Sequence, residues 1–404
     1  MKPYFLFYLT CLLPLVISAN NPQEVVDGNN KFAFKLFHEL NSVTGKNQFY
    51  SPFSISTALA MTYAGARSET AIQMGQTMNF QPGEKFHSDF KQLLGRLHEE
   101  TESKIKLNIA NGLWAQKDFK FLGSYFEIVK SNYKSELNNV NFSDDVEREK
   151  TRNEINSWVE QKTNNKIKDL LNQSDLTSLT RLVLVNAIYF YGDWAEPFKK
   201  EATVLKGFSM LDQTQLIVPF LNQKGMYNYY EDSKIQAVEI PYKGNKASMV
   251  IFLPKTTNGL TEFEKSFDYR YYMDIIGSFR FNDVRLSFPK FKLTYKTSLG
   301  TTLSRMGMPL AFSLGGADFS GMTGKRDLCI SDVIHQAFIN VDEKGTEAAA
   351  ATAVVMKCTS AAPSSDLKIF DADHPFVFLI KDNSTGSILF IGKILNPDVS
   401  DKTP

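Results

Sequence analysis

A run of small, uncharged side chains lies near the C-terminal end of the chain, where a surface loop would normally be polar. Residues 343 to 355 read EKGTEAAAATAVV, and between Gly345 and Ala353 the only large side chain is Glu347. Alanine in series favours a helix, but the preceding glycine and the following β-branched residues favour an extended chain. Small side chains at alternate positions would fit beneath neighbouring elements if the segment became a central strand of a sheet. The fold must therefore accept this segment either as a loop or as a buried strand.

The rest of the chain combines helical and strand-like patterns without a linker. Its 404 residues, of which 43% are hydrophobic, can bury a substantial core. Helical spacing prevails early and strand-like runs prevail later, which predicts one α+β domain over residues 20–404. We expect helices at Asn29–Leu40, Ser54–Gly65, Glu84–His98 and Glu149–Ile167. We expect strands at Arg181–Tyr191, Ala237–Pro241, Ala247–Leu253, Asp283–Thr294 and Ile334–Val341, with Phe376–Ile380 and Ser387–Ile391 forming a hairpin around KDNSTG.

The first 19 residues have the pattern of a secretory signal peptide. Lys2 precedes the apolar run Phe5–Ile17, and Ser18 and Ala19 supply small residues for cleavage. The run is too short for a membrane anchor, so the protein is expected to be secreted and extracellular, with no membrane partner. Three sequons agree with export and are candidate glycosylation sites: Asn141, Asn172 and Asn383.

Charge and motifs give no support to a nucleic-acid-binding protein or an enzyme. Lys and Arg number 45 against 44 Asp and Glu, so the net charge is +1 and no polyanionic partner is indicated. HExxH, CxxC and GxSxG motifs are absent from the sequence. GGADFSGMTGKR is not a phosphate-binding loop, since Phe319 and Arg326 occupy positions that require glycine and serine or threonine. We expect no catalytic residue, metal or cofactor.

Six segments, in order, resemble the serpin family across nearly the whole mature chain. They are NQFYSPFSISTALAMTYAGA, LNIANGLWAQ, INSWVEQKTNNKIKDLL, LVLVNAIYFYGDWAEPF, INVDEKGTEAAAATA and DHPFVFLIKDNSTGSILFIGKILNP. The resemblance implies a single-domain, monomeric serpin fold with three β-sheets, about nine helices and an exposed reactive-centre loop. The hinge and loop would occupy about residues 343–368.

The resemblance also implies the function of a suicide inhibitor. In inhibitory members a serine protease cuts the loop, and the loop inserts as a new strand in the large sheet, trapping the covalent acyl-enzyme. Insertion requires a hinge without bulky inward side chains. The inward positions here are small, and Glu347 is expected to point outward. The hinge residues are Gly345, Thr346, Glu347, Ala348, Ala349, Ala350 and Ala351. A non-inhibitory serpin that acts as a binding or carrier protein is the alternative.

Family spacing indicates the bond that the protease would cut. The scissile residue is usually the seventeenth when the glutamate before the hinge, Glu343, is counted as the first, which gives Thr359–Ser360. A small β-branched residue at this position suits a shallow pocket, as in elastase-like proteases. Cys358 and Lys357 are the alternative bait residues, and Lys357 would direct the loop to trypsin-like enzymes.

Other residues match family positions with structural roles. Ser51, Ser54, Asn186 and His335 resemble the polar cluster beneath the large sheet, where its strands part to admit the loop. Trp194, Lys290 and Glu343 resemble contacts at the top of the sheet, where Lys290 would pair with Glu343.

Two further features concern partners. After removal of the signal peptide, Cys329 and Cys358 are expected to be free thiols; a crosslink formed only after loop insertion is the alternative, because the two are too distant before it. The helix near Glu84–Glu100 has mixed charges and Lys199–Lys200 is an isolated pair, so no glycosaminoglycan cofactor is expected.

Overall fold

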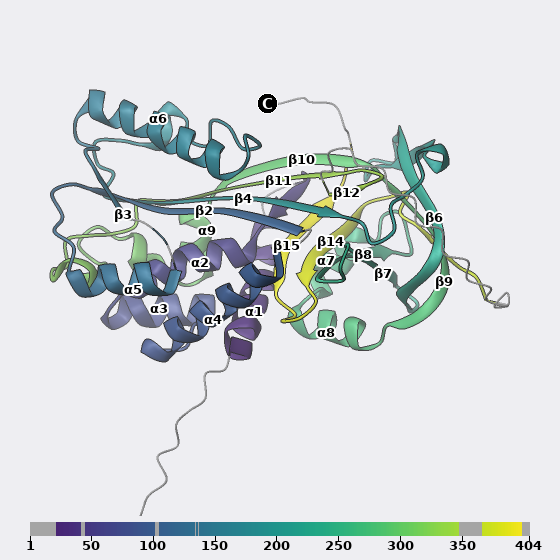
Figure 1. Cartoon of the computed structure of the whole chain (residues 1–404), viewed down its shortest axis with the longest axis horizontal. Helices are drawn as coiled ribbons and strands as arrows, with labels where there is room; N and C mark the ends of the chain where they lie inside the picture. Colours follow the sequence, from purple (N-terminus) through teal and green to yellow (C-terminus); the bar gives the residue numbers. More distant parts are fainter. Residues whose placement is uncertain are drawn as a thin grey trace, which may run out of the picture.

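A computed structural model describes residues 22–41, 45–101, 105–133, 135, 137–346 and 366–397, without the side chains of residues 98–101. The fold is α+β, and the described residues form two hydrogen-bonded sheets with helices around them (Figure 1). The helices are α1 (Pro22–Asn41), α2 (Pro52–Tyr63), α3 (Ser68–Met78), α4 (Glu84–Thr101), α5 (Gly123–Tyr133), α6 (Asp145–Lys162), α7 (Leu260–Ser266), α8 (Tyr269–Gly277), α9 (Gly300–Met306) and α10 (Ser320–Thr323). Three short 3-10 helices are η1 (Gln173–Asp175), η2 (Lys200–Ala202) and η3 (Pro309–Phe312).

The six-stranded sheet carries the candidate functional site. Its order is β10-β11-β12-β4-β2-β3, and β11 also pairs directly with β4. The strands are β2 (Ile105–Gln116), β3 (Leu137–Val140), β4 (Leu182–Asp193), β10 (Phe291–Ser298), β11 (Asp332–Val341) and β12 (Gly345–Thr346). β4 is buried along nearly its whole length, because helices and the second sheet cover one face and α6 covers part of the other.

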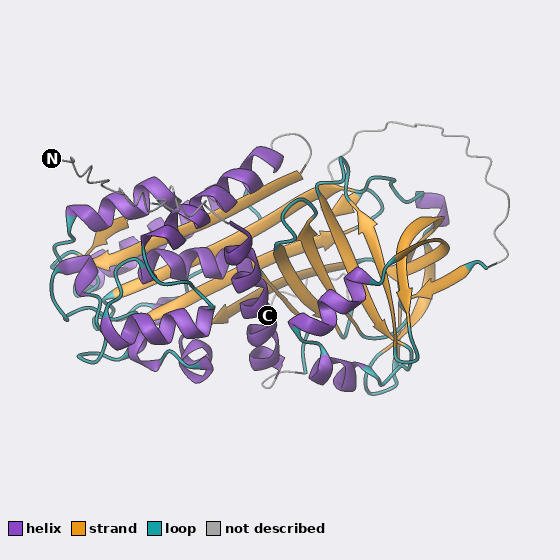
Figure 2. Ribbon diagram, turned by 90° about the horizontal axis from the view of Figure 1, so that it is seen from below, coloured by secondary structure: helices purple, strands orange, loops and turns teal. Residues whose placement is uncertain are grey.

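The second sheet has nine strands and forms the other half of the molecule, while most helices gather around the first half (Figure 2). Its order is β1-β15-β14-β8-β7-β6-β9-β13, with β5 paired to β6. The strands are β1 (Gln48–Tyr50), β5 (Val204–Ser209), β6 (Gln215–Glu231), β7 (Ile235–Pro241), β8 (Ala247–Pro254), β9 (Arg280–Pro289), β13 (Lys368–Asp371), β14 (Phe376–Asp382) and β15 (Ile388–Ile394). The predicted hairpin is the antiparallel pair β14 and β15.

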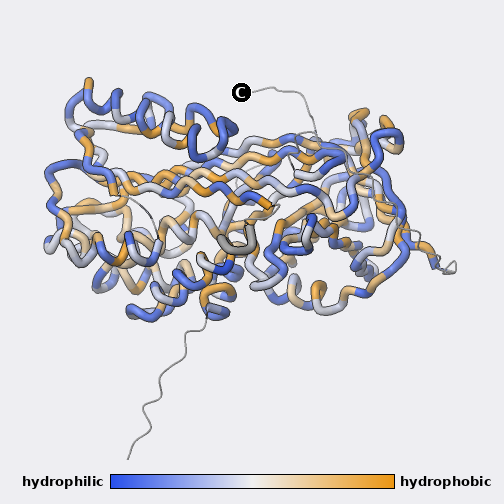
Figure 3. The backbone as a smooth tube through the Cα atoms, viewed as in Figure 1, coloured by the Kyte–Doolittle hydropathy of each residue, from blue (hydrophilic) through white to orange (hydrophobic). Residues whose placement is uncertain are grey.

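Helix α2 supports the middle of the six-stranded sheet from below. Ser51 caps it by accepting a hydrogen bond from the Ser54 backbone at 3.1 Å, and Pro52 occupies the first turn, where its missing N–H costs nothing. Nearly every side chain of α2 is buried, and its buried hydroxyl groups, those of Ser54, Ser56, Thr57 and Thr62, are hydrogen-bonded within the protein. On the opposite face, hydrophilic residues prevail along α6 (Figure 3), which packs Ile155 and Val159 onto the sheet.

Several predicted elements differ from the structure, and helix α1 begins at Pro22 instead of Asn29. The strand expected over Asp283–Thr294 is two strands, because the chain passes at Lys290 from β9 in one sheet to β10 in the other. The helix expected at Glu149–Ile167 spans Asp145–Lys162, since an Asp144 cap starts it earlier and left-handed residues follow Thr163. The fold class is confirmed, with ten α-helices in the described residues instead of about nine, and with two hydrogen-bonded sheets instead of three.

Candidate functional site

The first two hinge residues form a wedge between two strands. β11 and β4 pair in parallel from Asp332↔Val183 to Phe338↔Tyr189. Beyond this point β12 lies between them and is antiparallel to both, with Thr346 opposite Val341 on β11 and Gly345 opposite Asp193 on β4. The small-residue segment therefore starts at the end of a seam between two strands that pair directly along most of their length.

The wedge fits because of its small side chains. A Cβ atom on Gly345 would lie 2.1 Å from the Gly192 carbonyl oxygen, so only glycine allows this approach to β4. Thr346 is fully buried, and its hydroxyl is 2.7 Å from the Tyr242 hydroxyl. The Tyr242 ring stacks on Trp194 with centroids 4.6 Å apart, and burial raises the pKa of Tyr242. The wedge thus contacts Tyr242, whose ring is stacked on Trp194.

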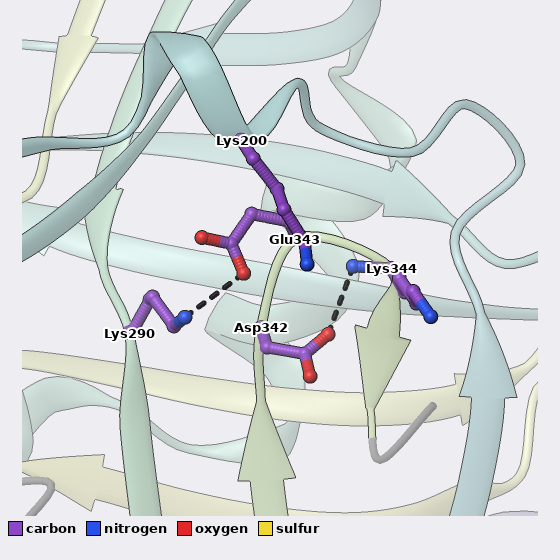
Figure 4. A pocket seen from close by; sticks show the side chains of 5 residues that line it. All are labelled: Lys200, Lys290, Asp342, Glu343 and Lys344. Atoms are coloured by element: carbon purple, nitrogen blue, oxygen red, sulfur yellow. Dashed lines mark hydrogen bonds and ion pairs between the residues drawn. The ribbon is translucent and has the colours of Figure 1, made fainter. Parts of the chain in front are cut away.

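The three predicted top-of-sheet residues surround the turn that leads into β12. Trp194 is fully buried, and its Nε1 donates a hydrogen bond to the Asp342 carbonyl oxygen at 2.9 Å. Lys290 Nζ lies 2.9 Å from Glu343 Oε2 (Figure 4), and the Thr203 hydroxyl donates to the other carboxylate oxygen at 2.9 Å. Burial raises the pKa of Glu343, but the hydrogen bonds from Lys290 and Thr203 outweigh it and hold the pKa below its ordinary value.

The four residues of the predicted polar cluster lie together beneath the seam. Asn186 on β4 and His335 on β11 are direct neighbours in the parallel register, and His335 Nδ1 is hydrogen-bonded to Asn186 Oδ1. Asn186 Nδ2 donates to Ser54 Oγ at 2.5 Å, and the Ser51 hydroxyl donates to the Leu389 carbonyl oxygen at 2.6 Å. The cluster joins β4, β11 and the start of α2.

The hydrogen bonds determine the protonation state of His335. The Ser51 backbone N–H can only donate, and it lies 3.2 Å from Nε2, so Nε2 accepts. Nδ1 therefore carries the proton and donates to Asn186. Complete burial lowers the pKa of His335 to about 3, which keeps the ring neutral at ordinary pH.

Asn111 is a member of this cluster that the sequence analysis missed. It lies opposite Asn186 in the β2–β4 register and accepts hydrogen bonds from Asn186 Nδ2 and, at 3.3 Å, from Ser54 Oγ. The available signal was a polar side chain within the strand-like motif LNIANGLWAQ, because a polar residue is rare inside a sheet and usually needs a hydrogen-bond partner there. Tyr242 and Thr203, which contact the hinge and Glu343, were missed in the same way.

Several predicted residues lie outside the described residues: the hinge residues Glu347 to Ala351, the bait candidates Lys357, Cys358 and Thr359 with Ser360, and the signal segment 1–19. Within the described ranges, no group of three or more potential metal ligands occurs. None of the helices in those ranges has both the length and the apolar character needed to cross a bilayer.

The three sequons have different surroundings. Asn172 is exposed beside η1, and Asn141 is half-buried with its Oδ1 accepting from Gln116 at 3.3 Å. Asn383 uses the amide nitrogen to which a glycan would attach, donating to Ser248 Oγ at 2.9 Å. A glycan at Asn383 would therefore replace an existing hydrogen bond.

Comparison with known proteins identifies close relatives. A family model described as Serpin (serine protease inhibitor) matches residues 27–397. The leukocyte elastase inhibitor of Xenopus tropicalis is 40% identical over 375 residues, covering 91% of this chain and 97% of the relative. The human leukocyte elastase inhibitor is 38% identical over 385 residues, covering 93% of this chain and 100% of the relative.

Solved structures agree with these relatives. Serpin48 of the insect Tenebrio molitor superposes with a TM-score of 0.83 at 31% identity, covering 93% of this chain and 99% of that structure. Human thyroxine-binding globulin in complex with thyroxine gives a TM-score of 0.84 at 32% identity, covering 93% and 100%.

The expectation of secretion is wrong. The curated relatives include leukocyte elastase inhibitors and serpin B6, which belong to the intracellular group and point away from secretion. An N-terminal apolar run is a single local pattern, and it carries less weight than similarity over more than nine-tenths of the chain. The expectation of glycans at the three sequons depended on export and loses its support.

Proposed function

Because the chain belongs to the serpin family, we propose that it is a suicide inhibitor of a serine protease, with the segment between Thr346 and Asp366 as the bait. The protease serine attacks the carbonyl carbon of Thr359 and forms an ester. The Ser360 amine takes a proton from the protease histidine and leaves with the C-terminal fragment. Inhibition requires that the loop inserts between β4 and β11 before water hydrolyses the ester.

The register of β12 is the observation that carries this proposal. Continued along the seam, each further loop residue pairs one position earlier on both β11 and β4. Thr352 would then lie between His335 and Asn186 and break the hydrogen bond that joins them. The Thr352 hydroxyl can supply a hydrogen bond in its place. The residues at alternate positions between Thr346 and Thr352 are alanines, which fit the buried face of the sheet.

The same register explains why the uncleaved chain would be a trapped state. Opening the seam breaks the parallel β4–β11 pairs and the His335–Asn186 hydrogen bond before any new pair forms. Each backbone hydrogen bond gained afterwards contributes roughly 0.5–1.5 kcal/mol, and about a dozen residues could form them. The inserted form is then the more stable one, and a barrier preserves the uncleaved form.

The target proposed is an elastase-like protease. Thr359 has a small side chain, and the Xenopus tropicalis and human relatives are both named leukocyte elastase inhibitors. Inhibition of a trypsin-like protease through Lys357 is the alternative within the same mechanism. A carrier function is the second candidate, because thyroxine-binding globulin in complex with thyroxine is a close structural neighbour.

A gel assay tests the proposal. The protein is mixed separately with elastase, trypsin, chymotrypsin and subtilisin, and we expect an SDS-resistant adduct with elastase. N-terminal sequencing of the released peptide identifies the bond: Ser360 as the first residue assigns Thr359, Thr359 assigns Cys358, and Cys358 assigns Lys357. Clean loop cleavage by all four proteases without an adduct would reject inhibition and favour the carrier.

A further inference from the structure

A charged cavity lies at the top of the six-stranded sheet, beside the turn into β12. Its volume is about 390 Å³, and five residues line it (Figure 4): Lys200, Lys290, Asp342, Glu343 and Lys344. Three side chains are lysines and two are carboxylates. The lining is therefore cationic, although the chain as a whole is nearly neutral.

Both carboxylates already have partners within the protein. Glu343 accepts hydrogen bonds from Lys290 and Thr203 at 2.9 Å each. Asp342 Oδ1 accepts from the backbone N–H groups of Lys344 at 2.8 Å and Gly345 at 3.3 Å. Glu343 is thus matched by a lysine, whereas Asp342 holds the turn through backbone N–H groups and keeps its charge, which leaves the five lining side chains with a net charge of +1.

Two of the lysines remain without such partners. Lys290 is paired with Glu343, whereas neither Lys200 nor Lys344 has an acidic partner among the residues that the structure describes. Figure 4 shows the Lys200 side chain running from its own segment down toward the turn that contains Glu343 and Lys344. Two ammonium groups from separate segments of the chain are therefore available at one cavity.

We propose that this cavity binds a small organic polyanion with two or three negative charges, such as a polycarboxylate or a phosphate ester. Lysine ammonium groups bind carboxylate and phosphate oxygens through charge-assisted hydrogen bonds. The volume falls in the range of small-molecule sites, about 300–1,000 Å³, so a single monovalent ion would leave most of it to water. The partly exposed cavity gives such a ligand access without opening the sheet.

A bound polyanion would join two segments that the fold already brings together. Lys200 belongs to η2, and Thr203, directly after η2, donates a hydrogen bond to Glu343 in the turn. A ligand that contacts Lys200 and Lys344 adds a second link between η2 and this turn. Because the turn leads directly into β12, occupancy would hold the wedge of Gly345 and Thr346 in place.

Calorimetric titration with citrate and with pyrophosphate tests the proposal, with sodium chloride at matched ionic strength as the reference. Loss of one charge-assisted hydrogen bond weakens binding by roughly 10-fold or more, which is the expected rise in Kd for Lys200→Ala and for Lys344→Ala. Lys199→Ala is the matched control, since Lys199 is the exposed neighbour of Lys200 and does not line the cavity.

The outcome of the titration either supports or overturns the proposed site. Saturable binding to the wild type that is weakened in both cavity variants but retained in the control supports the site. Binding of citrate alone indicates that the cavity recognises carboxylate groups, and binding of pyrophosphate alone indicates that it recognises phosphate groups. No saturation of the wild type at millimolar concentration, or equal affinity in all three variants, overturns the proposal. The unliganded unfolding midpoint of each variant shows that it has folded.

Discussion

Replacing Gly345 by alanine tests how the hinge enters the sheet. The added Cβ atom would lie 2.1 Å from the Gly192 carbonyl oxygen and 2.7 Å from Asp193 Cα, whereas real Cβ contacts essentially never fall below 3.0 Å. Both atoms belong to the β4 backbone, which β2 holds on its other side through the Ile105↔Gly192 pair. Because β4 cannot move away, we expect Gly345 and Thr346 to leave their position between β4 and β11.

The structure sets the size of this effect. Leaving the seam forfeits the register pairs of Gly345 and Thr346 with β4 and β11, and the hydrogen bond to Tyr242. At about 1 kcal/mol for each hydrogen bond, the loss is roughly 2–4 kcal/mol. If the same contacts are needed when insertion begins, insertion slows roughly 30- to 1,000-fold. Hydrolysis of the acyl-enzyme would then outrun trapping, and the protein would become a substrate.

The assay is the number of inhibitor molecules consumed per protease molecule inactivated, measured by titrating elastase activity. We expect about one for the wild type and many for Gly345→Ala, with cleaved protein and active protease on the gel. Gly95→Ala on α4 is the matched control, because a Cβ atom there meets nothing within 4 Å. A Gly345→Ala protein with the wild-type stoichiometry would refute the steric reasoning.

Three further predictions follow from buried or paired groups. Burial depresses the pKa of His335 to about 3 and that of His87 to about 4, so below pH 6.5 the unfolded chain takes up protons that the folded chain does not. The free energy of unfolding should fall by up to about 1.4 kcal/mol per pH unit for each histidine between pH 6.5 and 5, and an unfolding midpoint that is constant over this range would contradict it. If the β12 register continued three residues beyond the start of β11, it would place Cys358 opposite Cys329, with about 4.5–5.5 Å between the Cα atoms. Oxidised glutathione should therefore promote a disulfide between Cys329 and Cys358 in the cleaved protein. Peptide mapping that finds both thiols alkylated would contradict this. Glu343→Gln should cost about 1–3 kcal/mol in denaturant unfolding, since it leaves the half-buried ammonium of its partner without a carboxylate; an unchanged midpoint would count against that pair.

Local patterns in the sequence predicted part of the fold, including four of the ten described α-helices, whereas the long strands β2 and β6 had no predicted counterpart. Residues 376–394 form the expected hairpin, because alternating apolar residues around a turn sequence specify it locally. The passage of the chain at Lys290 from one sheet to the other has no such local signature. An extended segment looks the same whether one sheet or two receive it, so β9 and β10 appeared as one strand.

The polar cluster shows the corresponding limit for the candidate site. His335 is 284 residues from Ser51 and 149 residues from Asn186 along the chain, so only the family resemblance could group them before the structure was known. Asn111 was not predicted as a member of the cluster, because its contact with the other members depends on its register opposite Asn186. A cross-strand register is set by the fold as a whole and cannot be seen in a local pattern.

The central claim is that the cleaved loop becomes a strand between β4 and β11. The most direct test is the denaturant midpoint of unfolding for the intact protein and for the same protein cut once in the loop. Insertion would add about a dozen backbone hydrogen bonds at roughly 0.5–1.5 kcal/mol each, so the cleaved form should unfold at a much higher denaturant concentration. A cleaved form that unfolds at the same concentration as the intact protein, or at a lower one, would contradict insertion.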